Sequence, residues 1–367
     1  MSVLRRVVPL VLLAAGFASA DAQQLPGATG AVPGVRWESA LSAEALGWSS
    51  RDLAEVRKTV ESMGSAAFMI VTRGRIVAAW GDTSKTFLSH SIRKSFLSAL
   101  TGIAVAGGKL DTGATLAALG IDEKKTPLTA AEGQARVADL LRARSGIYLA
   151  AAGEVESMRS ERPARGSHPA GTHWYYNNWD FNALGTIYRR STGEDIFQAI
   201  DTRIARPIGM QDFRATEGEY YLEEPSEHAA FIFRISARDL ARFGVLYLNR
   251  GRWGERVVIP GSWVDASVRS HSVTSGLQRS AATRTGYGFM WWIQTNAAAH
   301  PEFRIPDGTF TASGAGGQRL TVIPQIETVI VNLMNTDQGL GSVGSSQWDP
   351  LLGLILAARL RGRDIGY

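Results

Sequence analysis

The sequence predicts an α+β protein in which an antiparallel sheet, flanked by N- and C-terminal helices, is interrupted by an inserted and mainly helical domain. Strand-like apolar runs gather near both ends of the chain, within residues 66–80 and 287–333. Helix-like periodicity fills most of the stretch between them. Amphipathic segments at residues 50–63 and 350–360 supply the two flanking helices.

The composition narrows the class of protein. Hydrophobic residues make up 45% and charged residues 20% of the 367 residues, which is typical of a globular chain of about two domains. The net charge of +5 comes mostly from scattered arginines, without the basic block and interleaved aromatics of a nucleic-acid-binding surface. The absence of cysteine excludes disulfides, thiolate metal sites and a cysteine nucleophile.

The N-terminus has the layout of a secretory signal peptide, which we place at residues 1–22. Arg5 and Arg6 precede an apolar stretch at residues 7–15, and small residues near Ala20 offer a cleavage site. We therefore expect a periplasmic or secreted protein, with a retained N-terminal anchor as the alternative. Residues 23–45 read as a flexible leader, and no later segment approaches the roughly 20 apolar residues of a membrane span.

The first part of the sheet domain, at residues 46–85, begins with a helix. Ser49 and Ser50 are favourable at a helix start, and the periodicity continues to about Met63. The apolar runs at residues 66–72 and 76–80 then predict two strands of a hairpin.

Residues 86–224 form the predicted helical domain. Its first helix starts at Ser91 and ends near Gly107 and Gly108, a typical helix stop. The pattern stays mostly helical to about residue 215, except for a Gly/Ser/Arg/Pro-rich loop at residues 152–171. A loop of that length is uncommon unless it shapes a site.

The second part of the sheet domain covers residues 225–367. A helix is expected from Ser236 to about Asn249, and a last one at residues 350–360. Between them, residues 287–294, 318–323 and 327–333 are strand-like. We expect the active site to lie between the sheet domain and the helical domain.

Ser91 and Lys94 form a Ser-x-x-Lys pair at the start of a helix, where positions i and i+3 share one face. A serine hydroxyl needs a base, and a lysine kept neutral by burial or a nearby cation can be that base. Chance pairs occur, but Lys94 is the only one of six lysines with a serine three residues before it. The helix also has an apolar face, made of Ile92, Phe96, Leu100, Ile103 and Ala104.

Two further segments offer supporting groups. In Tyr175-Tyr176-Asn177-Asn178, a phenol near the lysine could relay protons and an amide could orient it, although paired tyrosines also pack at domain boundaries. The glycines of residues 311–317 could let a backbone N–H approach a ligand, or could simply precede the next strand. The chain has no G-x-S-x-G, H-E-x-x-H or P-loop motif, and its histidines are dispersed.

The order and spacing of these motifs resemble those of serine β-lactamases and penicillin-binding proteins. The resemblance covers residues 46–360 and is to the class C-like branch, with its esterases, D-amino-acid peptidases and 6-aminohexanoate-dimer (nylon oligomer) hydrolases. It is carried by three segments: His90-Ser91-Ile92-Arg93-Lys94-Ser95-Phe96 with Gly102-Ile103-Ala104, Leu140-Leu141-Arg142-Ala143-Arg144-Ser145-Gly146-Ile147, and Pro169-Ala170-Gly171. The implied fold is β-lactamase/transpeptidase-like.

The resemblance also implies site roles. Ser91 would be acylated, Lys94 would share its proton, and Tyr176 with Asn178 would complete the centre. Tyr175 with Asn177 is the second register. The N–H groups of Ser91 and Ala315 would hold the oxyanion, and no metal or cofactor would be needed. We expect the pocket to be lined by Tyr148, Trp174, Tyr175, Trp179, Ser313 and Gly314.

One difference from the motifs of that family guides the expected substrate. Ala312-Ser313-Gly314 stands where relatives have Lys-Thr-Gly or His-x-Gly, so the family's cation is missing, and Arg304 or Arg319 would have to replace it. We therefore expect an exported serine hydrolase acting on a small-molecule ester or linear amide, like the 6-aminohexanoate-dimer hydrolases. A D-Ala-D-Ala carboxypeptidase or weak β-lactamase is the alternative, and a non-catalytic penicillin- or peptidoglycan-binding protein is the third reading.

Overall fold

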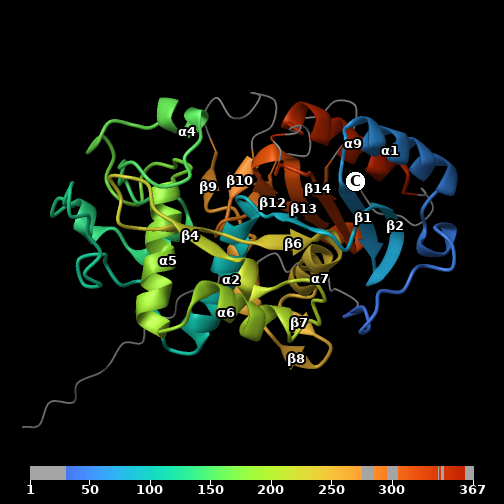
Figure 1. Cartoon of the computed structure of the whole chain (residues 1–367), viewed down its shortest axis with the longest axis horizontal. Coiled ribbons are helices and arrows are strands. Elements are labelled where there is room, and N and C mark those ends of the chain that lie inside the picture. Colours follow the sequence, from blue (N-terminus) through green and yellow to red (C-terminus); the bar gives the residue numbers. More distant parts are fainter. Residues whose placement is uncertain (1–29, 275–284, 296–304, 338, 340–342, 360–367) are drawn as a thin grey trace, which may run out of the picture.

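The structure is a computed structural model that describes residues 30–274, 285–295, 305–337, 339 and 343–359 (Figure 1). The predicted signal peptide, the first part of the leader and Arg304 therefore lie outside the described residues. None of the described helices is both long and apolar enough to cross a membrane.

An eight-stranded antiparallel sheet forms one half of the molecule, in the order β2-β1-β14-β13-β12-β11-β10-β9. Strands that are far apart in the sequence pair within it, where Ile70 of β1 lies opposite Ile330 of β14. The strands are β1 (Ala67–Thr72), β2 (Arg75–Gly81), β9 (Ser272–Val273), β10 (Thr285–Tyr287), β11 (Trp292–Gln294), β12 (Phe310–Gly314), β13 (Gln318–Ile323) and β14 (Thr328–Leu333).

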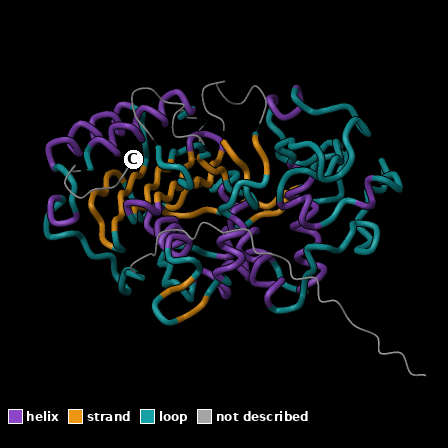
Figure 2. The backbone as a smooth tube through the Cα atoms, turned by 180° about the vertical axis from the view of Figure 1, so that it is seen from behind, coloured by secondary structure: helices purple, strands orange, loops and turns teal. Residues whose placement is uncertain are grey.

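The central strands are buried on both faces because each face packs against helices. In β1, Phe68 and Ile70 join one apolar cluster, whereas Met69 and Val71, on the opposite face, join the other. The first cluster includes α1 (Ser50–Ser62) and α9 (Ser345–Ala357), which lie side by side along the sheet (Figures 1 and 2). The second face is covered by α7 (Ala237–Leu248) and by α2 (Ile92–Ala106).

The other half of the molecule surrounds α2 and α5 (Asn178–Thr192). Helix α2 contacts α5 on one side and the strand β12 on the other, so it lies between the two halves. The remaining elements are short: α3 (Val137–Leu141), α4 (Glu156–Ser160), α6 (Ile196–Ala199), a π-helix (Ile200–Ala205), α8 (Gly261–Ser267), and the two-stranded sheets β3 (Thr86–Leu88) with β6 (Arg234–Ser236), β4 (Glu219–Tyr221) with β5 (Ala230–Ile232), and β7 (Arg252–Trp253) with β8 (Arg256–Val257).

The helix starts were predictable because their caps are local. Ser49 Oγ accepts a hydrogen bond from Asp52 N at the start of α1, and Ser236 Oγ accepts one from Asp239 N at the start of α7. The first hairpin is also confirmed, with β1 and β2 joined at Arg73 and Gly74. These features depend on residues within one or two turns of each other.

Three predicted elements are wrong in detail. Residues 287–294 are two strands, β10 and β11, because Gly288 N bonds to Trp291 O in a turn that places Met290 at φ 62°. Residues 107–177 contain only short helices between long loops, although their apolar residues are buried as a helix pattern would require. Helix α9 begins at Ser345 rather than Pro350, and Trp348 in the turn before Pro350 buries its side chain.

Candidate active site

Ser91 is the N-cap residue of α2 and follows a strained residue. His90 adopts φ 44°, in the left-handed region that non-glycine residues seldom occupy. Its ring Nε2 lies 2.8 Å from Thr336 Oγ1. The segment before the helix is also held by Gln318, whose Nε2 donates to Leu88 O at 3.0 Å. These contacts hold the backbone just before Ser91 and so fix the direction of its side chain.

Lys94 lies at the centre of a set of polar contacts. Its Nζ is 3.0 Å from Ser91 Oγ, 2.7 Å from the Tyr176 hydroxyl and 2.7 Å from Asn178 Oδ1. A neutral amine has two N–H donors and one lone pair. It can therefore donate to Tyr176 and Asn178 while it accepts the hydroxyl proton of Ser91. The three contacts are therefore compatible with an uncharged lysine, and the surroundings of the amine decide its charge.

The surroundings of Lys94 favour that uncharged form. Its side chain is buried, with aromatic rings of Tyr176 and Phe181 at 4.2 and 4.6 Å from Nζ. Burial, and secondarily the charge of Arg93, lower the pKa of Lys94 well below its usual value. None of the ion pairs in the described part of the chain includes Lys94.

A buried network holds the start of α5 against the loop at residues 145–153. Asp180 accepts hydrogen bonds from Ser145 Oγ and from Asn177 Nδ2. Asn177 Nδ2 also donates to Ile147 O, and Asn178 Nδ2 donates to Gly153 O at 2.6 Å. Because Asn178 is tied to this loop, its Oδ1 is left facing Lys94.

The two adjacent tyrosines have different surroundings. The Tyr176 hydroxyl reaches Lys94, and its ring stacks on Trp292 with centroids 5.3 Å apart. The Tyr175 hydroxyl donates instead to Met158 O at 2.6 Å, on the far side of the backbone. Successive residues of an extended segment point in opposite directions, so only one of the two can face the lysine. The geometry places Tyr176 and Asn178 there.

The strand β12 brings a glycine against the start of α2. A Cβ on Gly314 would lie 2.8 Å from Ser89 O and 3.1 Å from His90 Cβ, so only glycine allows this approach. Residues 311–314 are themselves a strand rather than a segment before one, and a tight turn at Ala315–Gly317 leads into β13. The backbone of Ala315 thereby lines the same cavity as Ser91.

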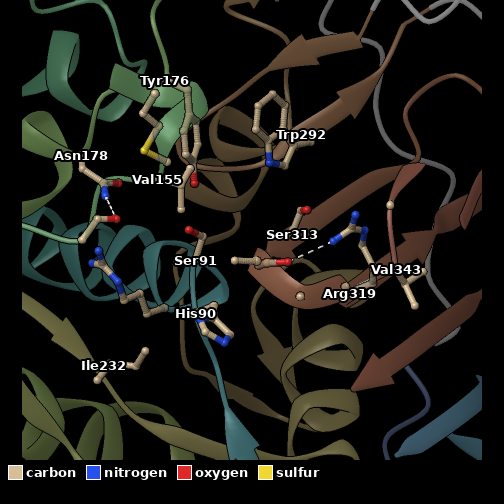
Figure 3. Close-up of a pocket in the computed structure, with 18 of the residues that line it drawn as sticks. His90, Ser91, Val155, Tyr176, Asn178, Ile232, Trp292, Ser313, Arg319 and Val343 are labelled. Carbon is tan, nitrogen blue, oxygen red and sulfur yellow. Dashed lines mark hydrogen bonds between the residues drawn. The ribbon is translucent and has the colours of Figure 1, made fainter. Parts of the chain in front are cut away.

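A cavity of about 370 Å³ lies beside Ser91. In Figure 3, Tyr176 and Asn178 lie on one side of Ser91, and Ser313 and Arg319 lie on the other. Further lining residues come from both halves of the molecule: Arg93, Gly153, Val155, Met158, Tyr221, Ile232, Trp292 and residues 314–317, 343 and 344. As formed by the described residues, the cavity therefore has room for a small molecule in contact with Ser91.

Four residues expected to line the pocket do not line this cavity. Tyr175 is turned toward Met158 O, and Tyr148 packs edge-on against the Tyr175 ring. Trp179 is fully buried in α5, where Nε1 donates to Glu123 Oε1 at 2.7 Å. Trp174 packs behind the lining, against Trp292. The aromatic positions were expected from residue type, whereas orientation decides which of them reach the cavity.

A different cation, Arg319 on the next strand, lies close to position 312, where the family's cation is missing. Ala312 is buried, whereas Arg319 of β13 pairs with Ser313 and extends on the same side, into the cavity. Its Nη1 donates to Gly314 O and Gln318 O, and burial lowers its pKa to about 10. The other candidate, Arg304, lies outside the described residues.

Sequence reasoning missed several residues around this centre. Asp180 and Gln318 act on it through other groups, and nothing in their local pattern indicates that role. Arg93 stood inside the quoted motif, but its burial could not be read from the sequence. Among the described residues, no group of three His, Asp or Glu side chains is placed to hold a metal ion.

Comparison with known proteins shows the family to which the chain belongs. The family model described as Beta-lactamase matches residues 53–347. The chain belongs to the Beta-lactamase family. The family fold, a large antiparallel sheet with helices, agrees with the α+β, β-lactamase/transpeptidase-like fold expected from the sequence.

Several solved structures share this fold over most of their length. A candidate 6-aminohexanoate-dimer hydrolase from Bacillus anthracis has 20% identity and a TM-score of 0.65, covering 91% of this chain and 88% of its own. A penicillin-binding protein homologue from Caulobacter crescentus has 16% identity and a TM-score of 0.60, covering 85% and 99%. A class C β-lactamase has 16% identity and a TM-score of 0.59, covering 85% and 98%.

One curated protein also matches. It is an uncharacterized protein of Alkalihalophilus pseudofirmus, 20% identical over 184 residues, or 46% of this chain. The chain spans about half the length of that relative, 53%. At these identities the similarities show the fold, and the activity has to be argued from the site.

Proposed function

We propose that this Beta-lactamase-family protein is a serine hydrolase that cleaves a small ester or a linear amide through an acyl-enzyme on Ser91. The observation that carries the proposal is the position of Lys94 Nζ, within hydrogen-bond distance of both Ser91 Oγ and the Tyr176 hydroxyl. A nucleophile, a neutral base and a proton relay are then in contact before substrate arrives.

In the acylation step, Ser91 Oγ attacks the carbonyl carbon while its proton passes to the lone pair of Lys94. The carbonyl oxygen becomes an oxyanion, held by the N–H groups of Ser91 and Ala315 at the start of α2 and the end of β12. Tyr176 donates its proton to the leaving alcohol or amine as the C–O or C–N bond breaks. Lys94 returns a proton to Tyr176 along their hydrogen bond.

Deacylation reverses these roles. A water molecule attacks the ester carbon of the acyl-enzyme and gives a proton to Tyr176, which passes its own proton to Lys94 along their hydrogen bond. The Ser91 Oγ–carbon bond breaks, and Lys94 delivers a proton to Ser91 Oγ. Each oxyanion-hole donor is worth about 3 kcal/mol of transition-state stabilisation in other enzymes of this type. The proposed chemistry uses only side chains and backbone groups of this chain, without a metal or cofactor.

The substrate preference follows from β12. Ala312 cannot supply the cation with which β-lactamases and penicillin-binding proteins hold a carboxylate, which favours an ester or a linear amide such as the 6-aminohexanoate dimer. The similarity to the candidate 6-aminohexanoate-dimer hydrolase supports this choice only through its fold. The signal-like residues 1–22 support a periplasmic or secreted location.

A second function is favoured by one observation. Arg319 extends into the cavity beside Ser313, where a guanidinium could hold a substrate carboxylate. This supports a D-Ala-D-Ala carboxypeptidase or a weak β-lactamase. A non-catalytic penicillin- or peptidoglycan-binding protein is a third reading, which the contacts of Lys94 with Ser91 and Tyr176 disfavour.

The test is the initial rate of hydrolysis by the mature protein and its Ser91→Ala variant on four substrates. These are a short-chain 4-nitrophenyl ester, the linear 6-aminohexanoate dimer, a chromogenic cephalosporin and a D-Ala-D-Ala peptide. We expect turnover of the ester or the dimer that Ser91→Ala abolishes without lowering the melting temperature. Serine-dependent cleavage of the cephalosporin or peptide alone would support the second function. Undiminished turnover by Ser91→Ala would refute the proposed nucleophile.

A further inference from the structure

We propose that Arg93, on the helix that begins at Ser91, provides the positive charge near the base that Ala312 cannot provide. This charge keeps Lys94 neutral. The inference rests on the proposed function, because it assigns a role in preparing the base. Arg93 is a positioning residue in this proposal, since it acts on the reaction through Lys94.

Arg93 is a buried charge without an anionic partner. Its side chain is 3% exposed, and its guanidinium lies 4.6 Å from the centre of the Phe231 ring. Nη2 donates to Asn182 Oδ1 at 3.4 Å, and Nη1 has no hydrogen-bond partner among the described residues. A guanidinium stays protonated in proteins, so this charge persists inside the fold at a cost in free energy.

Arg93 and Lys94 share the same surroundings. They are consecutive residues at the start of α2, and both face α5, where two amides one turn apart accept their hydrogen bonds. Lys94 Nζ uses Asn178 Oδ1, and Arg93 Nη2 uses Asn182 Oδ1. Neutral amide oxygens solvate a cation but do not cancel its charge. Two cations side by side in a medium of low dielectric repel strongly.

The repulsion acts on the lysine, because it is the one of the two that can lose its proton. After burial itself, Arg93 is the neighbour that lowers the pKa of Lys94. No ion pair in the described ranges includes either residue, so no carboxylate offsets the effect. The other ionisable groups around them are His90 on the same segment, Tyr176 just before α5, Asp180 in its first turn, and Tyr221 on β4.

These neighbours do not take over the role of Arg93. The Asp180 carboxylate is bonded to Ser145 and Asn177, in the network that faces the loop at residues 145–153. Burial lowers the pKa of His90, which keeps that ring neutral near pH 7. Arg319 lies across the cavity, with Ser313 and Gly314. Arg93 is therefore the charged residue placed to disfavour protonation of Lys94.

The experiment follows the protonation of Lys94 directly. The chain has six lysines, and the other five are exposed, so selective 13Cε-lysine labelling gives a spectrum in which Lys94 stands apart. Spectra are recorded against pH for the Ser91→Ala protein, with and without Arg93→Met. We expect Lys94 to titrate well below the other five lysines, and at least one pH unit higher once Arg93→Met is introduced. This measurement does not depend on turnover.

The kinetic readout has a definite sign. The active form needs neutral Lys94, so kcat/KM rises with pH through the pKa of Lys94 and then levels off. Removing the positive charge at Arg93 raises that pKa, so the acid limb, the rising part of the kcat/KM profile, moves to higher pH. At a fixed pH on this limb, kcat/KM then falls about tenfold for each pH unit that the limb moves. Arg93→Gln is a second neutral variant that keeps a donor for Asn182. Arg93→Lys replaces the permanent charge with one that burial can remove, so its limb should lie between those of the wild type and Arg93→Gln.

Arg319→Met is the matched control, since it removes one guanidinium from the same cavity on the other side of Ser91. On a neutral ester its acid limb should stay at the wild-type position. An Arg93→Met protein that loses the same factor at every pH, or an unmoved Lys94 titration, would overturn the proposal and leave Arg93 a packing residue. Absence of serine-dependent turnover in the wild type refutes the proposed function separately, while the Lys94 titration still decides the role of Arg93.

Discussion

Substituting Gly314 by alanine tests the placement of the oxyanion hole. The backbone at Gly314, with φ −121° and ψ 156°, suits any residue, so alanine brings no dihedral strain. Its Cβ would nevertheless lie 2.8 Å from Ser89 O and 3.1 Å from His90 Cβ. Relieving the contact with His90 Cβ requires β12 to move about half an ångström or more away from the start of α2, since carbon atoms rest at about 3.5–4.0 Å.

That displacement is comparable with the tolerance of the hole. Oxyanion donors act at about 2.7–3.1 Å, and Ala315 follows Gly314 directly, so its N–H would move out of range. Loss of one donor costs about 10²–10³ in kcat in other serine hydrolases, or about 3–4 kcal/mol. We expect Gly314→Ala to lower kcat by about that factor, with about 1–3 kcal/mol lost from the free energy of unfolding through overpacking.

The assay is kcat on a 4-nitrophenyl ester, normalised to active sites, beside thermal unfolding. Gly185→Ala is the control, because it adds the same methyl group inside α5 at ordinary contact distances of 3.4 Å and more, away from Ser91. It should leave kcat unchanged and gain up to about 1 kcal/mol in helix propensity. A folded Gly314→Ala protein within threefold of the wild-type kcat would refute the assignment of the Ala315 N–H to the oxyanion.

Two other predictions address the relay and the substrate. Tyr176→Phe should lower kcat by about 10²–10⁴, because it removes the hydroxyl in contact with Lys94, whereas Tyr175→Phe should cost only about 1 kcal/mol of stability through its lost bond to Met158 O. Equal kcat losses in the two variants, measured on the same ester, would contradict this assignment. Since the described lining residues include Arg93 and Arg319 but no carboxylate, kcat/KM should be higher for an ester whose leaving group ends in a carboxylate than for one whose leaving group ends in an ammonium. An ammonium-terminated ester that reacts faster would show that the charge of the lining does not select the substrate.

The parts of the site that were predictable depend on short-range rules. Ser91 and Lys94 meet because they are three residues apart on one helix, and the helix was expected from its periodicity and its glycine stop. The hairpin of β1 and β2 follows equally from a turn between two apolar runs. The turn at residues 288–291 was missed because Met290 adopts a left-handed conformation that its residue type does not indicate.

The long stretch between α2 and α5 shows why periodicity can mislead. Leu116, Ile121 and Leu149 are buried, yet they lie in loops rather than helices. Apolar residues are buried wherever the chain passes over a core, and irregular segments can do this if their backbone groups find partners. Here they do, as when Leu116 N bonds to Ala135 O.

The sequence by itself determined that Ser91 and Lys94 lie together at the start of a helix, because positions three residues apart share one helix face, and it also fixed the order of the motifs. The tertiary structure decided which tyrosine reaches Lys94, which aromatic residues line the cavity, and that Arg93 is buried beside the base. Each of these depends on how α5 and β12 pack against α2, between residues more than 80 positions apart. Side-chain direction and dielectric surroundings are properties of that packing, so no pattern within a single segment contains them.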